Sequence, residues 1–155
     1  MENNIGKKKT LLILILHGHS LANKKMLLQG ASDGPLTPKG EMQAKVLGDH
    51  LRAFKIDHLV SSDLTRAIRT AEAVARHHDL VVEATALARE WDCGIWDGRT
   101  AQEFLAMLAQ SGKPVSAFEP EGGETLDEVR KRACELIESI VSNHSGETVA
   151  VSSHG

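Results

Sequence analysis

Two short apolar segments, each followed by a His-Gly pair, constrain the fold of this chain more than any other feature. Residues 11–16 lead into His17-Gly18, and residues 149–153 lead into His154-Gly155. Continuous apolar runs of this length predict fully buried β-strands. Ligands of open α/β sheets bind outside the carboxyl ends of the strands. The sequence therefore predicts one site, at that edge of the sheet, that uses two imidazoles.

The chain between these two segments alternates between strand and helix patterns. A helix is expected to begin at Pro38, with Thr37 as its N-cap. Further strands are expected over 56–60 and 80–82, and amphipathic helices over 64–77, 101–109 and 126–141. This alternation predicts an α/β protein whose sheet is largely parallel.

Length, charge and cysteine content restrict the class of protein. The 155 residues suffice for one domain with a buried core. We expect residues 1–9 to form a flexible tail, and residues 85–124 to form a long excursion that acts as a substrate-specific lid.

The net charge of −3 favours no nucleic-acid partner. No segment approaches the ~18 apolar residues that span a membrane. Two cysteines make no disulfide framework, so a cytoplasmic location is expected.

Five polar residues form a set that suits phosphoryl transfer. A histidine can hold a phosphoryl group covalently, and the transfer itself needs mainly positioning and positive charge around the phosphate oxygens. We assign His17 as the nucleophile and expect Arg66, Asn23 and His154 to bind the phosphate. Glu90 would protonate the leaving alcohol and then take a proton from the attacking water.

A metal-dependent hydrolase that uses His17, His19 and Glu90 is an alternative. The two histidines lie two residues apart in a predicted turn, which is poor evidence for a metal site. A phosphate pocket built from protein groups alone is the simpler account. We therefore expect neither a metal nor another cofactor.

Four segments, taken in order, resemble the sequence blocks of the histidine phosphatase superfamily. The family opens with Arg-His-Gly-x-Ser/Thr-x-x-Asn, and residues 16–23 stand in its place as Leu-His-Gly-His-Ser-Leu-Ala-Asn. Residues 61–72, 89–98 and 149–155 are similar to the blocks that carry the arginine, the glutamate and the second histidine. The resemblance implies a three-layer, phosphoglycerate mutase-like sandwich with a mostly parallel central sheet. It also implies phosphate binding at Gly18 and substrate contacts at Ser20, Gln29 and Gly30.

Within this superfamily, residues 98–104 and 120–126 look most like the small phosphatases that act on fructose-2,6-bisphosphate and related sugar or glycerate phosphates. Mutases of the family usually carry a longer insertion than the 31 residues between Glu90 and Gly122. Hydrolysis is therefore favoured, with mutase activity as an alternative.

Glu124 is either a substrate contact or a charge that complements the dipole of the next helix. The expected partner is a small phosphorylated metabolite, bound by a monomer or homodimer.

Two features depart from the family pattern. Leu16 occupies the position of an arginine that binds the transferring phosphate, and its apolar side chain is expected to desolvate the pocket. Losing one such donor costs about 3–4 kcal/mol of transition-state stabilisation. The chain also ends at Gly155, which suggests a C-terminal truncation and a poorly fixed His154. A weakened phosphatase and a catalytically inactive relative that binds a phosphorylated ligand or a protein partner are both consistent with these departures.

Overall fold

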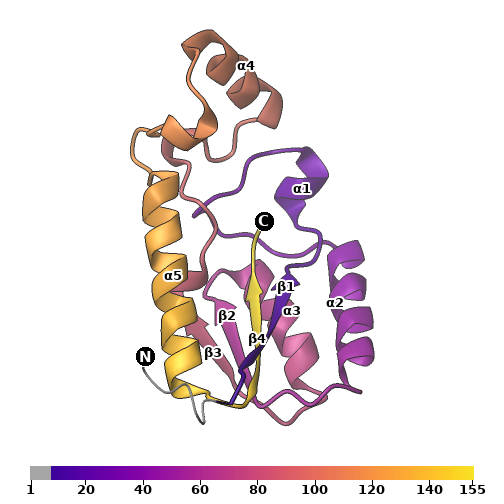
Figure 1. The fold of residues 1–155 in the computed structure, drawn as a ribbon. Helices are drawn as coiled ribbons and strands as arrows, with labels where there is room; N and C mark the ends of the chain where they lie inside the picture. Colours follow the sequence, from indigo (N-terminus) through magenta and orange to yellow (C-terminus); the bar gives the residue numbers. More distant parts are fainter. Residues whose placement is uncertain (1–7) are drawn as a thin grey trace, which may run out of the picture.

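The computed structural model describes residues 8–155, which are built around a four-stranded sheet. The strand order is β1-β4-β2-β3, and every neighbouring pair is parallel. The first and last strands in the sequence are thus direct neighbours (Figure 1). Their register places Leu16 opposite Ser153. The strands are β1 (Leu11–Leu16), β2 (His58–Ser62), β3 (Val82–Thr85) and β4 (Thr148–Ser153).

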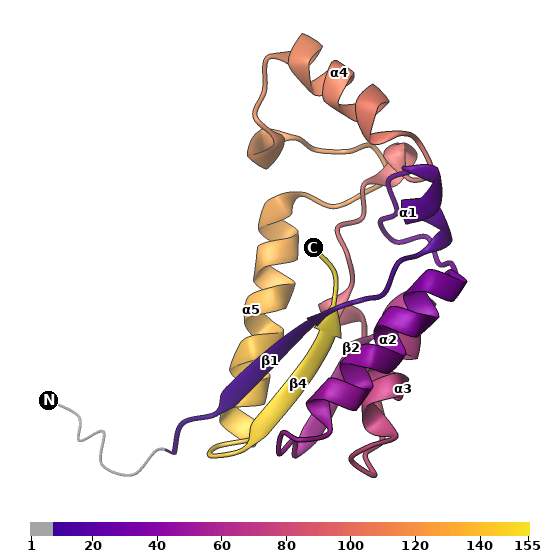
Figure 2. The same ribbon diagram turned by 90° about the vertical axis from the view of Figure 1, so that its right-hand side faces the viewer.

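Helices cover both faces of the sheet and give the predicted three layers (Figures 1 and 2). On one face, α2 (Pro38–Leu51) and α3 (Thr65–Ala75) pack in a core that includes Ile15, Leu59 and Ala150. On the other face, α5 (Leu126–Asn143) packs its Ile140 against the alternate strand residues Val60, Val149 and Val151. The alternation arises because successive strand side chains point to opposite faces.

Among the described residues, every α-helix except α3 begins where the sequence supplies a capping side chain, whereas α3 begins after Leu64 without one. The Thr37 side chain accepts a hydrogen bond from the Gly40 amide, and Pro38 is the first residue of α2, as predicted. Thr125 and Glu128 form a capping box at the start of α5. The remaining helices are α1 (Leu21–Lys25), α4 (Ala101–Ser111) and the 3₁₀ turns Ala86–Ala88, Gly94–Trp96 and Val115–Ala117.

Three strand predictions need correction. The prediction that residues 11–16 form a fully buried strand is wrong, because β1 lies at the edge of the sheet and Leu14 is 75% exposed. Leu14 and Leu16 line an open apolar groove between the sheet and α5. The strands expected at residues 56 and 80 each begin two residues later. Ile56 packs in the core ahead of β2, and pairing with β3 starts only where Leu59 meets Val82.

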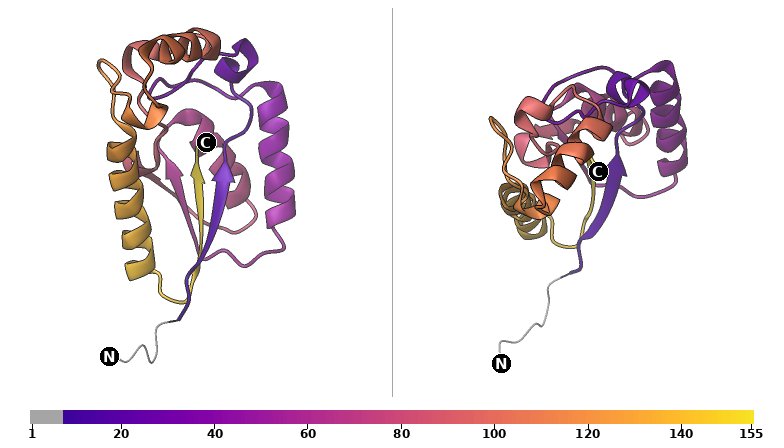
Figure 3. Two further views of the ribbon diagram at one scale, coloured as in Figure 1. Left: turned by 45° about the horizontal axis from the view of Figure 1, so that its top comes forward. Right: turned by 90° about the horizontal axis from the view of Figure 1, so that it is seen from above.

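The predicted excursion, residues 85–124, is folded around its own aromatic cluster. Trp91, Trp96, Phe104 and Phe118 contact one another edge to face, with ring centroids 5.4–6.4 Å apart. The segment places α4 beyond the carboxyl ends of the strands (Figure 3). Its role as a lid stays a prediction.

The expected tail, residues 1–9, falls mostly outside the described residues, which begin at Lys8. Within the described part of the chain, no helix combines the length and apolar character needed to cross a bilayer.

The loop after β1 packs tightly against the start of α2, and this contact requires two glycines. A Cβ on Gly18 would lie 2.6 Å from the Gly40 carbonyl oxygen, and a Cβ on Gly40 would lie 2.2 Å from the His19 carbonyl oxygen. Both clashes are with backbone, which cannot turn away as a flexible side chain can. The close approach fixes the path of the chain immediately after His17.

We therefore expect Gly40→Ala to lower the free energy of unfolding by about 1–3 kcal/mol, because the added methyl group displaces this loop. Lys45→Ala, on the exposed face of the same helix, is the control. It removes only a surface ion pair with Asp49 and is expected to cost less than about 1 kcal/mol. Urea unfolding followed by circular dichroism measures both. Equal stability of the two variants would show that the contact does not constrain the loop.

Candidate active site

The structure brings the two predicted imidazoles together at the carboxyl edge of the sheet. His17 follows β1 and His154 follows β4, and these strands are neighbours. The His17 amide donates to the Ser153 carbonyl oxygen at 3.2 Å, which extends the strand pairing up to the site. The two ring centroids are 5.1 Å apart, in an edge-to-face arrangement.

The hydrogen bonding of His17 suits a nucleophile. Its Nδ1 lies 2.7 Å from the Gly18 carbonyl oxygen, which can only accept, so Nδ1 carries the proton. Nε2 then carries a free lone pair. Burial lowers the pKa of His17 below its ordinary value, and the Arg66 charge lowers it further, against the opposing effect of the Gly18 hydrogen bond. The ring is therefore neutral at pH 7.

His154 is held in the complementary tautomer. Arg66 Nε donates to His154 Nδ1 at 3.2 Å, so the ring proton is on Nε2. That Nε2 is buried and has no hydrogen-bond partner among the described residues. Burial, with the charges of Arg66 and His17, lowers the pKa of His154 to about 3. His154 is thus a neutral, fixed donor, in contrast to the poorly held side chain expected near a chain end.

Arg66 is almost fully buried and holds the loop that follows α1. Its Nη1 donates to the Ser32 carbonyl oxygen, and its Nη2 donates to those of Gln29 and Gly30. Together with the bond to His154, four contacts use the guanidinium, which has five N–H groups. One N–H group of Arg66 therefore remains for a phosphate oxygen in this arrangement. Arg66 acts here as a cross-link and as a positive charge beside His154.

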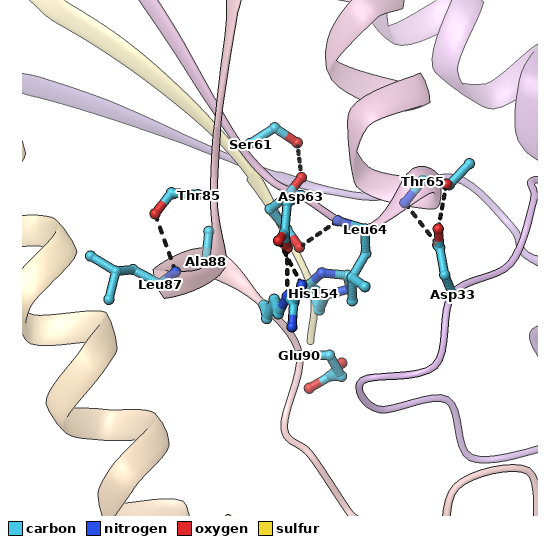
Figure 4. Close-up of polar contacts among 12 residues, drawn as sticks. Asp33, Ser61, Asp63, Leu64, Thr65, Thr85, Leu87, Ala88, Glu90 and His154 are labelled. Atoms are coloured by element: carbon cyan, nitrogen blue, oxygen red, sulfur yellow. Dashed lines mark hydrogen bonds and ion pairs between the residues drawn. The ribbon is translucent and has the colours of Figure 1, made fainter.

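The same loop is tied to the start of α3 by a second contact. The two carboxylate oxygens of Asp33 accept hydrogen bonds from the amide and the hydroxyl of Thr65, the residue before Arg66 (Figure 4). Arg66 therefore enters the site from a helix end whose position relative to residues 29–34 is fixed.

Glu90 lies beside the end of β4, with its carboxyl oxygen Oε1 accepting from the Trp91 amide at 2.8 Å. Burial raises the pKa of Glu90 above its ordinary value, although hydrogen bonds from the Trp91 and Gly155 amides and the charges of Arg66 and Arg132 oppose the rise. A raised pKa favours a protonated carboxyl group, which can act as a general acid.

A cavity of about 390 Å³ lies beside His17 and Glu90, whereas His154 lines the neighbouring groove beside α5. The polar lining of the cavity comes from the catalytic candidates His17 and Glu90 and from Asn23 and Gln29. Asn23 Oδ1 accepts from the Ser20 amide, which leaves its Nδ2 hydrogens available to a ligand. The other lining residues are Leu27, Leu28, Gly30, Trp91, Cys93, Leu126 and Gly155. The cavity is large enough for a small phosphorylated metabolite.

Other predicted site residues have structural partners. The Gly18 amide donates to Thr70 Oγ1, and the buried Ser20 hydroxyl donates to Gln29 Oε1. Gly30 approaches the Trp91 carbonyl so closely that a Cβ would lie 2.4 Å from it. The Glu124 carboxylate pairs with Arg132 and accepts from the Asp92 amide, outside the cavity lining.

The expectation about Leu16 changes, and the positions of His19 and Cys93 bear on two other possible roles. Leu16 is 64% exposed and, together with His154 and Glu90, lines the groove beside α5 rather than the cavity, so the expected desolvation of the cavity by Leu16 is not seen. His19 Nδ1 lies 2.9 Å from Thr37 Oγ1, and across residues 8–155 the donor atoms of His17, His19 and Glu90 do not converge on a point. Cys93 lines the cavity, but burial raises the pKa of its thiol to about 11, which argues against a thiolate nucleophile.

Comparison with known proteins agrees with this geometry. The model of the histidine phosphatase superfamily (branch 1) matches residues 12–155. The chain belongs to the histidine phosphatase superfamily.

Several superfamily members are similar over most of this chain. The fructose-2,6-bisphosphatase TIGAR of Bos taurus is 35% identical over 134 residues, covering 83% of this chain and 50% of the relative. The probable phosphoglycerate mutase GpmB of Salmonella choleraesuis is 32% identical over 146 residues, covering 92% and 68%. A mycobacterial glucosyl-3-phosphoglycerate phosphatase, solved with VO3, superposes with a TM-score of 0.84 at 28% identity, covering 93% and 75%. The chain thus spans about half the length of its TIGAR relatives.

Sequence reasoning missed Arg132, which positions the segment that carries Glu90. From α5, Arg132 donates to the carbonyl oxygens of Leu87, Arg89 and Glu90, while Glu124 neutralises it. A second clamp joins Arg89 to Asp63 through two hydrogen bonds of 2.6 Å. Arg132 sits within an amphipathic helix pattern, where a charged residue normally faces water, so its inward role left no local signal.

The buried neutral state of His154 predicts a specific pH dependence of stability. Its pKa is about 3 in the folded chain and near 6.5 when exposed, so between these values only the unfolded chain binds the proton. The contribution of His154 to the free energy of unfolding is therefore complete above about pH 6.5 and falls as the pH drops below that value. The raised pKa of Glu90 has the opposite sign, because the folded chain then binds the proton more readily.

His154→Gln is expected to lose less stability than the parent chain between about pH 7 and pH 5. His50→Gln, on the exposed side of α2, is the control and retains the buried imidazole. Urea unfolding at a series of pH values measures all three. Parallel curves for the parent and His154→Gln would contradict the neutral, buried state of His154.

Proposed function

We propose that this chain is a phosphatase that hydrolyses small phosphate monoesters through a phosphohistidine on His17. The observation that carries the proposal is the pair of opposite tautomers in one site. His17 presents a free Nε2 lone pair, and His154, 5.1 Å away between ring centroids, presents an Nε2 hydrogen with no partner. One group can attack phosphorus while the other donates to a phosphate oxygen.

The first step forms a covalent intermediate. The Nε2 lone pair of His17 attacks phosphorus, and the bond between phosphorus and the ester oxygen breaks. The leaving oxygen takes the proton of the Glu90 carboxyl group, whose raised pKa supports this role. The charges of Arg66 and the Nε2 hydrogen of His154 stabilise the negative phosphate oxygens.

The second step reverses these roles. The Glu90 carboxylate removes a proton from water, and the resulting hydroxide attacks the phosphorylated His17. The N–P bond breaks, its electron pair returns to Nε2, and inorganic phosphate leaves. Glu90 is again protonated, so the cycle closes without a metal or another cofactor.

We propose that the substrate is a sugar or glycerate phosphate, such as fructose-2,6-bisphosphate or a phosphoglycerate ester. The names of TIGAR and of the glucosyl-3-phosphoglycerate phosphatase support this class. The mixed lining of the cavity also supports it, because Asn23 and Gln29 offer hydrogen bonds and Trp91 and Leu126 offer apolar contact.

The name of GpmB makes mutase activity the second candidate. Conversion of 3-phosphoglycerate to its 2-isomer, measured beside phosphate release, separates the two.

Leu16 weakens the reaction in this proposal, because it supplies no donor to the transferring phosphate and the Arg66 hydrogens are mostly engaged. We expect Leu16→Arg to raise kcat for phosphate release from an aryl phosphate by about 10²–10³. His17→Ala is expected to lower it more than about a thousandfold. His19→Ala, whose ring contacts Thr37 outside the cavity, is the control.

Full turnover by His17→Ala would refute the assigned nucleophile. Failure of both the parent chain and Leu16→Arg to release phosphate, while phosphate esters still bind, would favour a ligand-binding role without catalysis. Activity of Leu16→Arg with an inactive parent would locate the defect at this one position.

A further inference from the structure

A second cluster of histidine and carboxylate groups lies at the opposite end of the sheet. His58 begins β2, His144 follows the last turn of α5, and Glu147 precedes β4. These residues are separated by up to 89 positions in the sequence and meet only because β2 and β4 are neighbours. The strand β4 separates Glu147 from His154 by roughly 20 Å. The cluster is therefore independent of the candidate active site.

The donor atoms of the cluster converge. Glu147 Oε2 lies 3.1 Å from His58 Nε2 and 3.0 Å from His144 Nδ1. One ligand atom from each of the three residues lies within 4.8 Å of the other two. The two imidazole centroids are 4.0 Å apart. Within residues 8–155 this is the group of histidine, cysteine and acidic side chains that could hold one metal ion.

We propose that His58, His144 and Glu147 bind a divalent transition-metal ion of the Zn²⁺ class. Two imidazole nitrogens and one carboxylate oxygen are a donor set that Zn²⁺ uses in proteins. With bonds of about 2.0–2.1 Å, tetrahedral geometry places donor atoms about 3.3–3.4 Å apart. The distances from Glu147 Oε2 to His58 Nε2 and to His144 Nδ1 are already within a few tenths of an ångström of that value. Water would complete the coordination.

The surroundings leave the three ligands free for the ion. Asp57, the other nearby carboxylate, is already engaged, since its oxygens pair with Lys55 and accept from the Thr148 amide. The three side chains are 32%, 19% and 42% exposed, so an ion can reach them from solvent and the imidazoles have room to adjust. Glu147 supplies negative charge to both imidazoles.

An ion at this position would join three elements. It would attach the end of α5 to the starts of β2 and β4, where the chain otherwise relies on hydrogen bonds such as that of Thr10 Oγ1 to the His144 carbonyl oxygen. Because the ion binds the folded chain and the cluster does not exist in the unfolded chain, binding raises the melting temperature.

The test is titration of the metal-free protein with Zn²⁺ and with Co²⁺, which gives a visible spectrum in tetrahedral sites. We expect one ion per chain at micromolar concentrations, a tetrahedral Co²⁺ spectrum and a rise in melting temperature. His58→Gln and Glu147→Gln should each weaken binding at least tenfold and remove the thermal shift. Circular dichroism of the metal-free variants checks that they are folded.

Two controls locate the ion. His77→Gln removes a histidine that contacts a single carboxylate, Asp49, and should bind as the parent does. His17→Gln removes one imidazole of the other histidine pair and should also retain binding. If a ligand variant does not fold, Co²⁺-induced broadening of NMR signals in the parent chain serves instead, and it should centre on residues 58 and 144–147. Absence of stoichiometric binding, or binding that is lost in His17→Gln and kept in His58→Gln, would overturn the proposal.

Discussion

The parallel pairing of β1 with β4 is the constraint on which the rest of the site depends. It joins residues 11–16 to residues 148–153, and one histidine of the pair follows directly after each strand. No turn between neighbouring residues can create this contact, because a parallel pair needs a long crossover connection. Here the connection is nearly the whole chain, with α2, β2, α3, β3 and α5 inside it. The approach of His17 to His154 is therefore a property of the complete sheet.

Two arginines, the buried Arg66 and the half-buried Arg132, supply positive charge to the site. Arg66 uses most of its donors on backbone carbonyls and on His154 Nδ1, and Arg132 does the same for the segment that carries Glu90. Burial lowers the pKa of both imidazoles, and the charge of Arg66 lowers both further, whereas the charge of Arg132 lowers only that of His154. The lowered pKa of His17 favours the neutral imidazole that the proposed attack on phosphorus needs, and the raised pKa of Glu90 favours its proposed role as proton donor.

Local sequence signals predicted much of this fold. The apolar runs before His17 and His154 form strands, and Thr37 with Pro38 starts a helix, because each signal depends on a few adjacent residues. Edge exposure of Leu14 and the engagement of the Arg66 donors could not be predicted, because both depend on which elements become neighbours. The same holds for Arg132 and for the cluster of His58, His144 and Glu147, whose members have no common motif.

Trapping a phosphorylated His17 tests most directly whether its Nε2 attacks phosphorus, as we propose. The protein and its Leu16→Arg variant would be quenched in alkali during turnover of an aryl phosphate and mapped by mass spectrometry. NMR would assign the phosphorylated ring nitrogen. We predict one phosphoryl group per chain, on Nε2 of His17. Phosphate release without any phosphorylated His17, or with the phosphoryl group on another residue, would contradict it.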